Sequence, residues 1–122
     1  MKAFFKGFQG YRAYNKLPKS FKRVVFYSES FQDWHHLKPL LNALLDKEIN
    51  TTYVASDGKD PGLLKRSPNY KSIFIGKGFF RILFFQHLKA KLFILTMMDL
   101  NNFELKRSIH SVHYAYIFHS LT

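Results

Sequence analysis

Two stretches near the end of the chain decide the fold: AKLFILTMMDL at residues 90–100 and VHYAYIFHS at residues 112–120. Each contains a short apolar run rich in β-branched and aromatic residues, which is typical of a buried strand. Polar residues follow both runs, with Asp99 after the first and His119 and Ser120 after the second. Ligands of open α/β sheets bind outside the carboxyl ends of parallel strands. We therefore expect these side chains to line a ligand site.

Upstream of this pair the sequence predicts further strands and helices in alternation. Strands are expected at residues 22–28, 49–55, 72–76, 91–96 and 112–118, and helices at 33–47 and 79–88. The first helix carries a leucine stripe at core-facing offsets, made of Leu37, Leu40, Leu41, Leu44 and Leu45. Because Pro39 suits only a first turn, the regular helix is expected to begin near His36. Alternating strands and helices predict an α/β fold, with a Rossmann-like, mostly parallel sheet of about five strands.

Residues 1–21 form a basic, aromatic N-terminal segment ahead of the Rossmann-like domain expected at residues 22–122. They contain no acidic residue, and Phe4, Phe5, Phe8 and Tyr11 recur at helical spacing. A helix here would present one aromatic stripe and a basic remainder. Such a helix suits an anionic membrane surface. The alternative is a stripe packed on the protein with its lysines and arginines in solvent.

Composition limits the partners of the chain. The formal charge is +11 and there are no cysteines. The excess of positive charge indicates an anionic partner: a phosphorylated small molecule, nucleic acid or an acidic membrane surface. No secretory signal is visible and the apolar runs are too short to span a bilayer. We expect a cytoplasmic protein that can be held at the inner face of a membrane.

The remaining candidate residues each allow two interpretations. Gly76 and Gly78 flank Lys77 between a strand and a helix, as in half of a phosphate-binding turn, or they serve a tight turn only. Asp99 can bind a polyol hydroxyl or cap a turn, and Arg107 can meet phosphate or stay solvated. His119 can act as a base from a strand's carboxyl end, or lie at a frayed end. The histidine spacing predicts no metal site, and we expect no cofactor.

These residues also carry a family resemblance. Residues 88–108, followed by residues 113–120, are similar to the CDP-glycerol glycerophosphotransferase family of teichoic acid polymerases and primases. The similarity extends back through Lys38-Pro39-Leu40-Leu41 and Ser56-Asp57, and covers roughly residues 20–122. In that family a strand ends in a His-Gly-Thr motif. Here His119 takes the histidine position, Ser120 replaces the glycine, and Leu121 precedes Thr122.

The resemblance implies the N-terminal, acceptor-side half of a GT-B-like cell-wall transferase. Such an enzyme moves glycerol phosphate from CDP-glycerol to a hydroxyl of an anionic polymer or lipid-linked acceptor. His119 would be the base or a phosphate ligand, and Asp99, Asn101, Ser120 and Arg107 would contact substrate. The CDP-glycerol half is expected to be missing, so that this chain alone would be inactive.

A second hypothesis needs no catalysis. A small basic module that binds nucleic acid or an anionic surface would also explain the charge. Single-strand binders, however, cluster basic residues with aromatics on one face. In this sequence the charges are spread and most aromatics fall within apolar runs. We therefore expect nucleic acid to be the less favoured partner.

Overall fold

The computed structural model describes residues 2–95 and 113–116, with side chains from residue 4 to residue 95. Its helices are α1 (Lys2–Asn15), α2 (Trp34–Asp46) and α3 (Phe79–His87). Its strands are β1 (Val24–Ser28), β2 (Thr51–Ala55), β3 (Tyr70–Phe74), β4 (Leu92–Leu95) and β5 (His113–Tyr116). Three single-turn 3-10 helices also occur: η1 (Lys19–Phe21), η2 (Phe31–Asp33) and η3 (Pro61–Leu63).

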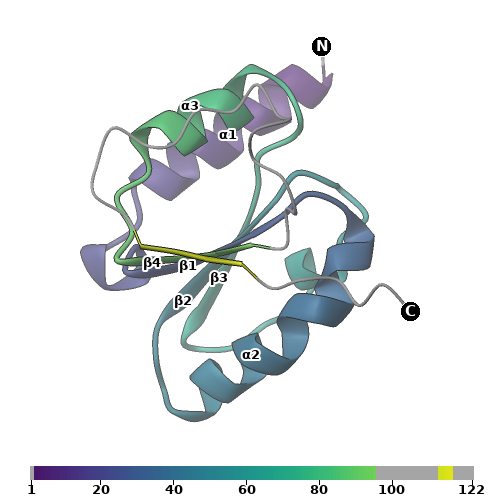
Figure 1. Cartoon of the computed structure of the whole chain (residues 1–122). Helices are drawn as coiled ribbons and strands as arrows, with labels where there is room; N and C mark the ends of the chain where they lie inside the picture. Colours follow the sequence, from purple (N-terminus) through teal and green to yellow (C-terminus); the bar gives the residue numbers. More distant parts are fainter. Residues whose placement is uncertain (1, 96–112, 117–122) are drawn as a thin grey trace.

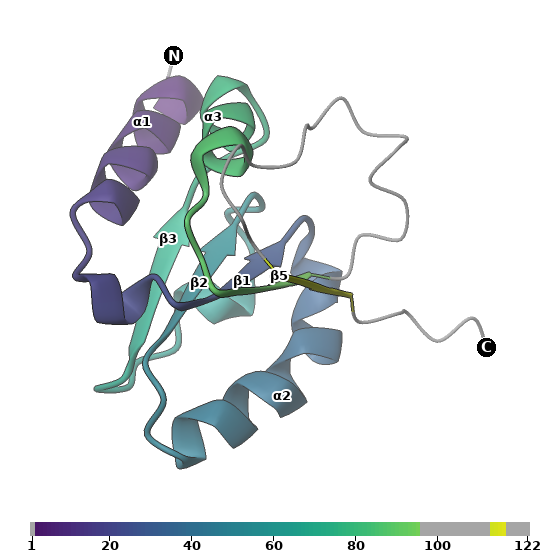
Figure 2. The same ribbon diagram turned by 60° about the vertical axis from the view of Figure 1, so that its left-hand side comes forward.

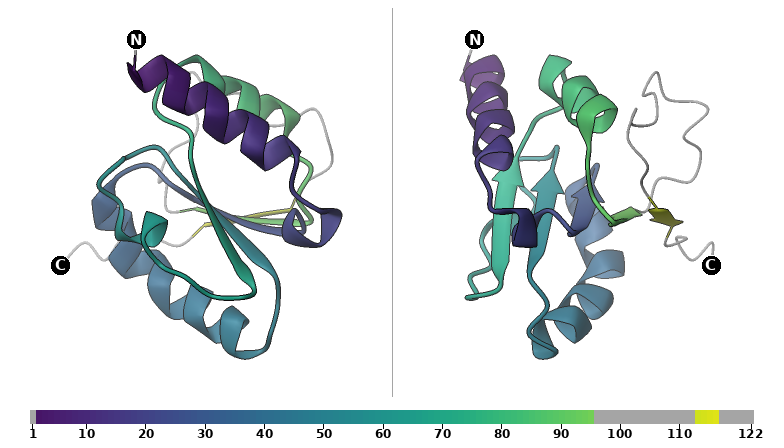
Figure 3. Two further views of the ribbon diagram at one scale, coloured as in Figure 1. Left: turned by 180° about the vertical axis from the view of Figure 1, so that it is seen from behind. Right: turned by 90° about the vertical axis from the view of Figure 1, so that its left-hand side faces the viewer.

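The strands form one parallel sheet in the order β3-β2-β1-β4-β5. Helices α1 and α3 cover one face of the sheet and α2 covers the other (Figures 1, 2 and 3). The two stretches that decide the fold pair as neighbouring strands, with Leu95 opposite Tyr116. The prediction of a Rossmann-like, parallel α/β sheet is confirmed.

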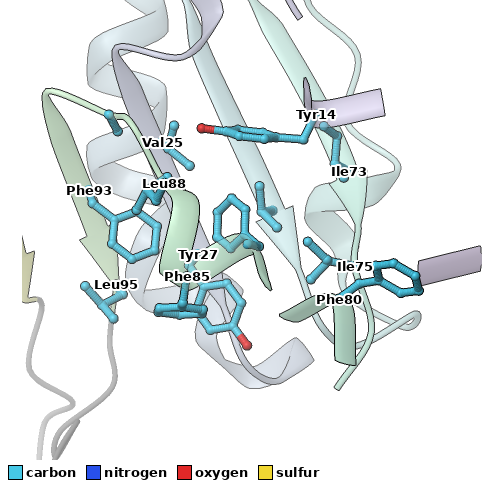
Figure 4. Close-up of a cluster of buried hydrophobic side chains, with 13 residues drawn as sticks. Tyr14, Val25, Tyr27, Ile73, Ile75, Phe80, Phe85, Leu88, Phe93 and Leu95 are labelled. Atoms are coloured by element: carbon cyan, nitrogen blue, oxygen red, sulfur yellow. The ribbon is translucent and has the colours of Figure 1, made fainter. Parts of the chain in front are cut away.

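Two hydrophobic cores lie on opposite faces of the sheet, because successive side chains of a strand point to opposite faces. Tyr27 faces α1 and α3, where its ring meets the edge of Phe85 with centroids 4.8 Å apart (Figure 4). Phe26 and Tyr53 face α2, where Trp34 packs with them. Both Phe26 and Tyr27 are fully buried, so β1 reads as a continuous apolar run.

Helix α2 begins at Trp34, two residues before the predicted start. Ser30 and Asp33 form a reciprocal capping box across η2, which leads directly into the helix. Pro39 lies inside α2 as a result. The predicted leucine stripe is partly wrong: Leu37 and Leu41 are buried, but Leu40 is 38% exposed.

Helix α1 packs on the protein through its glycines. Gly7 and Gly10 lie against the end of β3, and a Cβ atom at Gly10 would overlap the carbonyl oxygen of Phe74. The aromatic stripe points largely outward, with Phe4 59% and Phe5 60% exposed. The rings of Phe4, Phe8 and Tyr11 nevertheless contact Phe80 of α3, so the stripe is partly packed on the protein and partly exposed. The absence of a side chain is what lets α1 approach the sheet.

We predict that Gly10→Ala destabilises the fold although alanine favours helix. The added methyl group must displace backbone, so the free energy of unfolding should fall by roughly 1–3 kcal/mol. Gln9→Ala on the exposed side of α1 is the matched control and should change it by less than about 0.5 kcal/mol. Urea unfolding followed by circular dichroism measures both, and equal stability of the two variants would contradict the packing described here.

Candidate functional site at the carboxyl edge of the sheet

The strand order places a topological switch point beside β1. From β1 the chain moves outward through β2 to β3 and then returns to the other side of β1 as β4. The connections after β1 and β4 therefore leave in opposite directions, and ligands of such sheets bind at this switch point. β1 ends at Ser28 and is followed by Glu29, while β4 ends at Leu95. The two carboxyl ends define the candidate site.

A hydrogen-bonded cluster occupies the β1 side of this edge. The Tyr27 hydroxyl donates to Glu29 Oε2, and its oxygen lies 2.5 Å from Ser56 Oγ. Because the Tyr27 proton is directed to Glu29, Ser56 is the donor in the second bond. Burial, and then the neighbouring Glu29, raises the pKa of Tyr27 well above its usual value. Tyr27 is thus a neutral hydroxyl that holds Glu29 in place.

Arg81 connects this cluster to α3. Its Nη1 forms an ion pair with Glu29 Oε1, and its side chain is only 18% exposed. The Arg81 Nε atom is buried and has no hydrogen-bond partner within the described part of the chain. A guanidinium oriented by a carboxylate, with a donor still free, is suited to bind an anionic oxygen of a ligand.

A second cluster fixes the loop that follows β2. The carboxylate of Asp60 accepts hydrogen bonds from Ser28 Oγ, from the Tyr53 hydroxyl at 3.0 Å and from the Gly62 amide at 2.8 Å. Asp60 is 1% exposed, and burial raises its pKa above the ordinary value. These partners lie in β1, in β2 and in the loop that follows β2. Asp60 therefore holds that loop against the sheet.

Asp57 ties the same loop to the start of α2. It accepts hydrogen bonds from the amides of Lys59 at 3.0 Å and of Phe31 at 2.9 Å. These bonds hold the pKa of Asp57 below its ordinary value. The loops after β1 and β2 are therefore joined to each other at the edge where the candidate site lies.

The predicted phosphate-binding turn lies at this edge as well. Gly76 has φ of 76°, a left-handed conformation that favours glycine, and Gly78 is the N-cap of α3. The need for glycine at position 76 is thus explained by the turn itself. A side chain at Gly78 would meet nothing within 4 Å. The phosphate-binding role of these two glycines stays a prediction.

The other predicted site residues, Asp99, Asn101, Arg107, His119 and Ser120, lie outside the described residues. The structure does describe the strands that precede them: β4 and β5 are parallel neighbours in register.

The sequence interpretation missed the cluster of Tyr27, Glu29, Ser56 and Arg81. Its signal was the polar sequence Ser28-Glu29-Ser30 after the first strand. These polar residues follow the apolar run of their strand, just as Asp99 and His119 follow theirs.

Comparison with protein-family models, curated proteins and solved structures finds no match to this chain. Within residues 2–95 and 113–116, no three His, Asp or Glu side chains gather in a way that would hold a metal ion. The helices in that same part of the chain are all too short or too polar to cross a bilayer.

We predict that Asp60 makes stability depend on pH. A carboxyl whose pKa is raised by folding contributes stability that is fully present below its unfolded value, near 3.8, and is lost as pH rises through the folded value. The free energy of unfolding of the native chain, minus that of Asp60→Asn, should therefore decrease as pH rises from below 3.8. Urea unfolding at a series of pH values measures this difference. Asp46→Asn, which removes an exposed carboxylate, is the control, and the same pH trend in both variants would rule out the assignment.

Proposed function

We propose that this chain is the acceptor-side domain of a glycerophosphotransferase-like enzyme. The reaction would move glycerol phosphate from CDP-glycerol to a hydroxyl of a membrane-linked polymer or sugar. One observation carries the proposal. β4 pairs with β1 on the side opposite β2, and β5 pairs with β4, all in parallel. The strands β4 and β5 therefore end at the edge of the sheet that bears Glu29 and Arg81. The residues named by the family resemblance follow these two strands in the sequence.

Each group has a role in the proposed site. His119 would accept the proton of the attacking hydroxyl or bind phosphate, while Asp99 and Asn101 would orient the acceptor. Arg81 would donate to an acceptor phosphate through guanidinium N–H groups that do not bind Glu29, with Glu29 fixing the guanidinium plane. Transfer between two substrates requires both to be positioned together. A donor-binding half would therefore have to complete the site.

The proposal is tested by a transfer assay with CDP-glycerol and a lipid-linked acceptor. One sample is the 122-residue chain, and the other is translated through the DNA that follows the Thr122 codon. Turnover by the longer product that is lost in His119→Ala supports the proposal. Turnover by the 122 residues alone would overthrow the two-half arrangement, and no turnover by either product would overthrow the transferase assignment.

We predict that Arg81→Gln in the active form weakens acceptor binding. Losing one charge-assisted hydrogen bond to phosphate should raise the acceptor KM roughly tenfold, with a smaller effect on kcat. Arg66→Gln is the matched control, because Arg66 is exposed and donates to backbone carbonyls only. Steady-state kinetics with varied acceptor would contradict this role if both variants showed the same KM.

The same proposal places the domain at the inner face of a membrane. Phe4, Phe5 and Phe79 are more than half exposed, and Phe4 and Phe79 lie on either side of Phe80 with ring centroids 5.0 and 5.3 Å from it. Helices α1 and α3 both begin on this side of the molecule (Figure 1). Because Gly7 packs on Ile75, just past the end of β3, the patch lies at the carboxyl edge of the sheet. A lipid-linked acceptor would therefore be presented beside the candidate site.

We predict that Phe4→Ser/Phe5→Ser weakens binding to vesicles containing phosphatidylglycerol. Losing two aromatic anchors should lower the partition coefficient roughly tenfold or more. Leu64→Ser is the matched control, because Leu64 is 79% exposed and lies outside the patch. Vesicle co-sedimentation measures both variants. Equal binding by the two would contradict the membrane assignment, and salt-dependent binding to random oligonucleotides as strong as to vesicles would favour the nucleic-acid alternative.

A further inference from the structure

Basic side chains are concentrated at the amino edge of the sheet, although Asp46 and Glu48 at the end of α2 also lie there. Four of the described acidic residues follow β1 and β2 at the carboxyl edge: Glu29, Asp33, Asp57 and Asp60. The amino edge is where α1 and α3 end and where β1 and β4 begin (Figure 1). Basic residues gather there in sequence and space: Lys16, Lys19, Lys22, Arg23, Lys89 and Lys91. The opposite end of the domain from the candidate active site is therefore the more basic one.

A cavity of about 390 Å³ opens within this basic edge. It is lined by residues from the ends of α1 and α3 and from the segments leading into β1 and β4: Tyr11, Tyr14, Asn15, Lys22, His87 and Lys89. None of these described lining residues is a carboxylate. Two lysines and a histidine thus converge on a hollow whose remaining walls are two tyrosines and an asparagine.

Lys22 is held in the wall of this cavity. Its Nζ donates to the Asn15 carbonyl oxygen at 2.8 Å and lies 5.5 Å from the centroid of the Tyr14 ring. An ammonium carries three donors, so two N–H groups of Lys22 remain for another acceptor. Burial, and then the charge of Lys89, lowers the pKa of Lys22. The two lysines are therefore near enough to repel each other.

The ends of the two helices account for only part of this charge. A helix C-terminus carries a partial charge of about −0.5 and attracts cations. Lys22 meets this need for α1 through the Asn15 carbonyl, and His87 is the last residue of α3. Two helix ends together offset about one unit of charge, against two full charges from Lys22 and Lys89. Positive charge remains unbalanced at the cavity, and a bound anion would neutralise it.

We infer that this cavity is an anion site that binds the phosphate group of a small phosphoester. Lys22 and Lys89 would donate to the phosphate oxygens, and His87 would add a third donor through a ring N–H. The tyrosine rings would bound the remainder of a small ligand, since the cavity exceeds the volume of phosphate alone. This cavity lies at the opposite edge of the sheet from the candidate site at the ends of β1 and β4. The inference does not depend on the transferase proposal. The phosphate can belong to a soluble phosphoester or to a lipid headgroup.

The test is titration of the 122-residue chain with inorganic phosphate at constant ionic strength, followed by NMR of the backbone amides. Shifts should concentrate at residues 15, 22 and 87–89. Lys89→Gln should raise the dissociation constant roughly tenfold, because it removes one charge-assisted contact. Lys89 is exposed, so its substitution should leave the fold intact. Lys22→Gln/Lys89→Gln should abolish the local shifts.

Lys59→Gln is the matched control, because it removes the same charge from the loop after β2 at the opposite edge. It should change the dissociation constant by less than about twofold, since distant exposed charges are screened. Equal weakening by Lys59→Gln and Lys89→Gln would show non-specific attraction and overturn the site. Shifts spread evenly over the chain would overturn it as well.

A second arm distinguishes the two sources of phosphate. Vesicles of phosphatidylcholine, with and without phosphatidic acid, replace inorganic phosphate. Loss of vesicle binding in Lys89→Gln, without phosphate-induced shifts in the native chain, assigns the site to a lipid headgroup. Local shifts with free phosphate, and vesicle binding unchanged in Lys89→Gln, assign it to a soluble phosphoester. Insensitivity of both measurements to Lys89→Gln would overturn the inference.

Discussion

The central position of β1 is the constraint on which the rest of the structure depends. β1 pairs in parallel with β2 on one side and with β4 on the other, and its residues Val25, Phe26 and Tyr27 are fully buried. Parallel neighbours require crossovers, which place helices over both faces and leave the carboxyl end of β1 between diverging connections. The switch point beside Glu29 is therefore a consequence of strand order. The sheet makes a site at this point whatever chemistry fills it.

The polar clusters at the end of β1 follow from the same burial. Tyr27 and Ser28 are fully buried although each carries a hydroxyl, and a buried hydroxyl needs a partner. The Tyr27 hydroxyl is hydrogen-bonded to Glu29 and Ser56, whereas the Ser28 hydroxyl is hydrogen-bonded to Asp60. One residue of the strand thus orients the ion pair of the candidate site, and the next fixes the loop beside it. Packing and function share these two adjacent positions because successive side chains point to opposite faces.

How far the sequence predicts this fold depends on the length scale of each signal. Alternating apolar runs were enough for the parallel sheet, because burial on both faces leaves a continuous hydrophobic pattern. The direction that α1 faces was not predictable in this way. Its aromatic stripe gives a periodic signal, but the close approach to the sheet occurs at Gly7 and Gly10, which have no side chain to contribute to such a pattern. Tyr14, beyond the stripe, adds a buried contact with the core.

The candidate site was only partly predictable, for a similar reason. Glu29 and Arg81 are 52 positions apart, and no local pattern joins a carboxylate after the first strand to an arginine inside a helix. The rule that ligands bind at carboxyl ends of strands does apply to Glu29, as it applies to Asp99 and His119. Applied to every predicted strand, this rule would have identified Glu29, which is one partner of the ion pair. The partner emerges only when α3 is packed over β1.

The separation of charge between the two edges gives the domain a direction. Parallel strands place the helix C-termini at one edge, and such ends favour cations. Lys22 at the end of α1 and His87 at the end of α3 follow this preference, whereas α2 ends at Asp46. The same geometry places the loops after the strands at the other edge, where carboxylates such as Asp33 and Asp57 bond to backbone amides of the loops. Within the described residues, lysine and arginine side chains are therefore most concentrated at the amino edge. At the carboxyl edge, the guanidinium of Arg81 is oriented by its ion pair with Glu29.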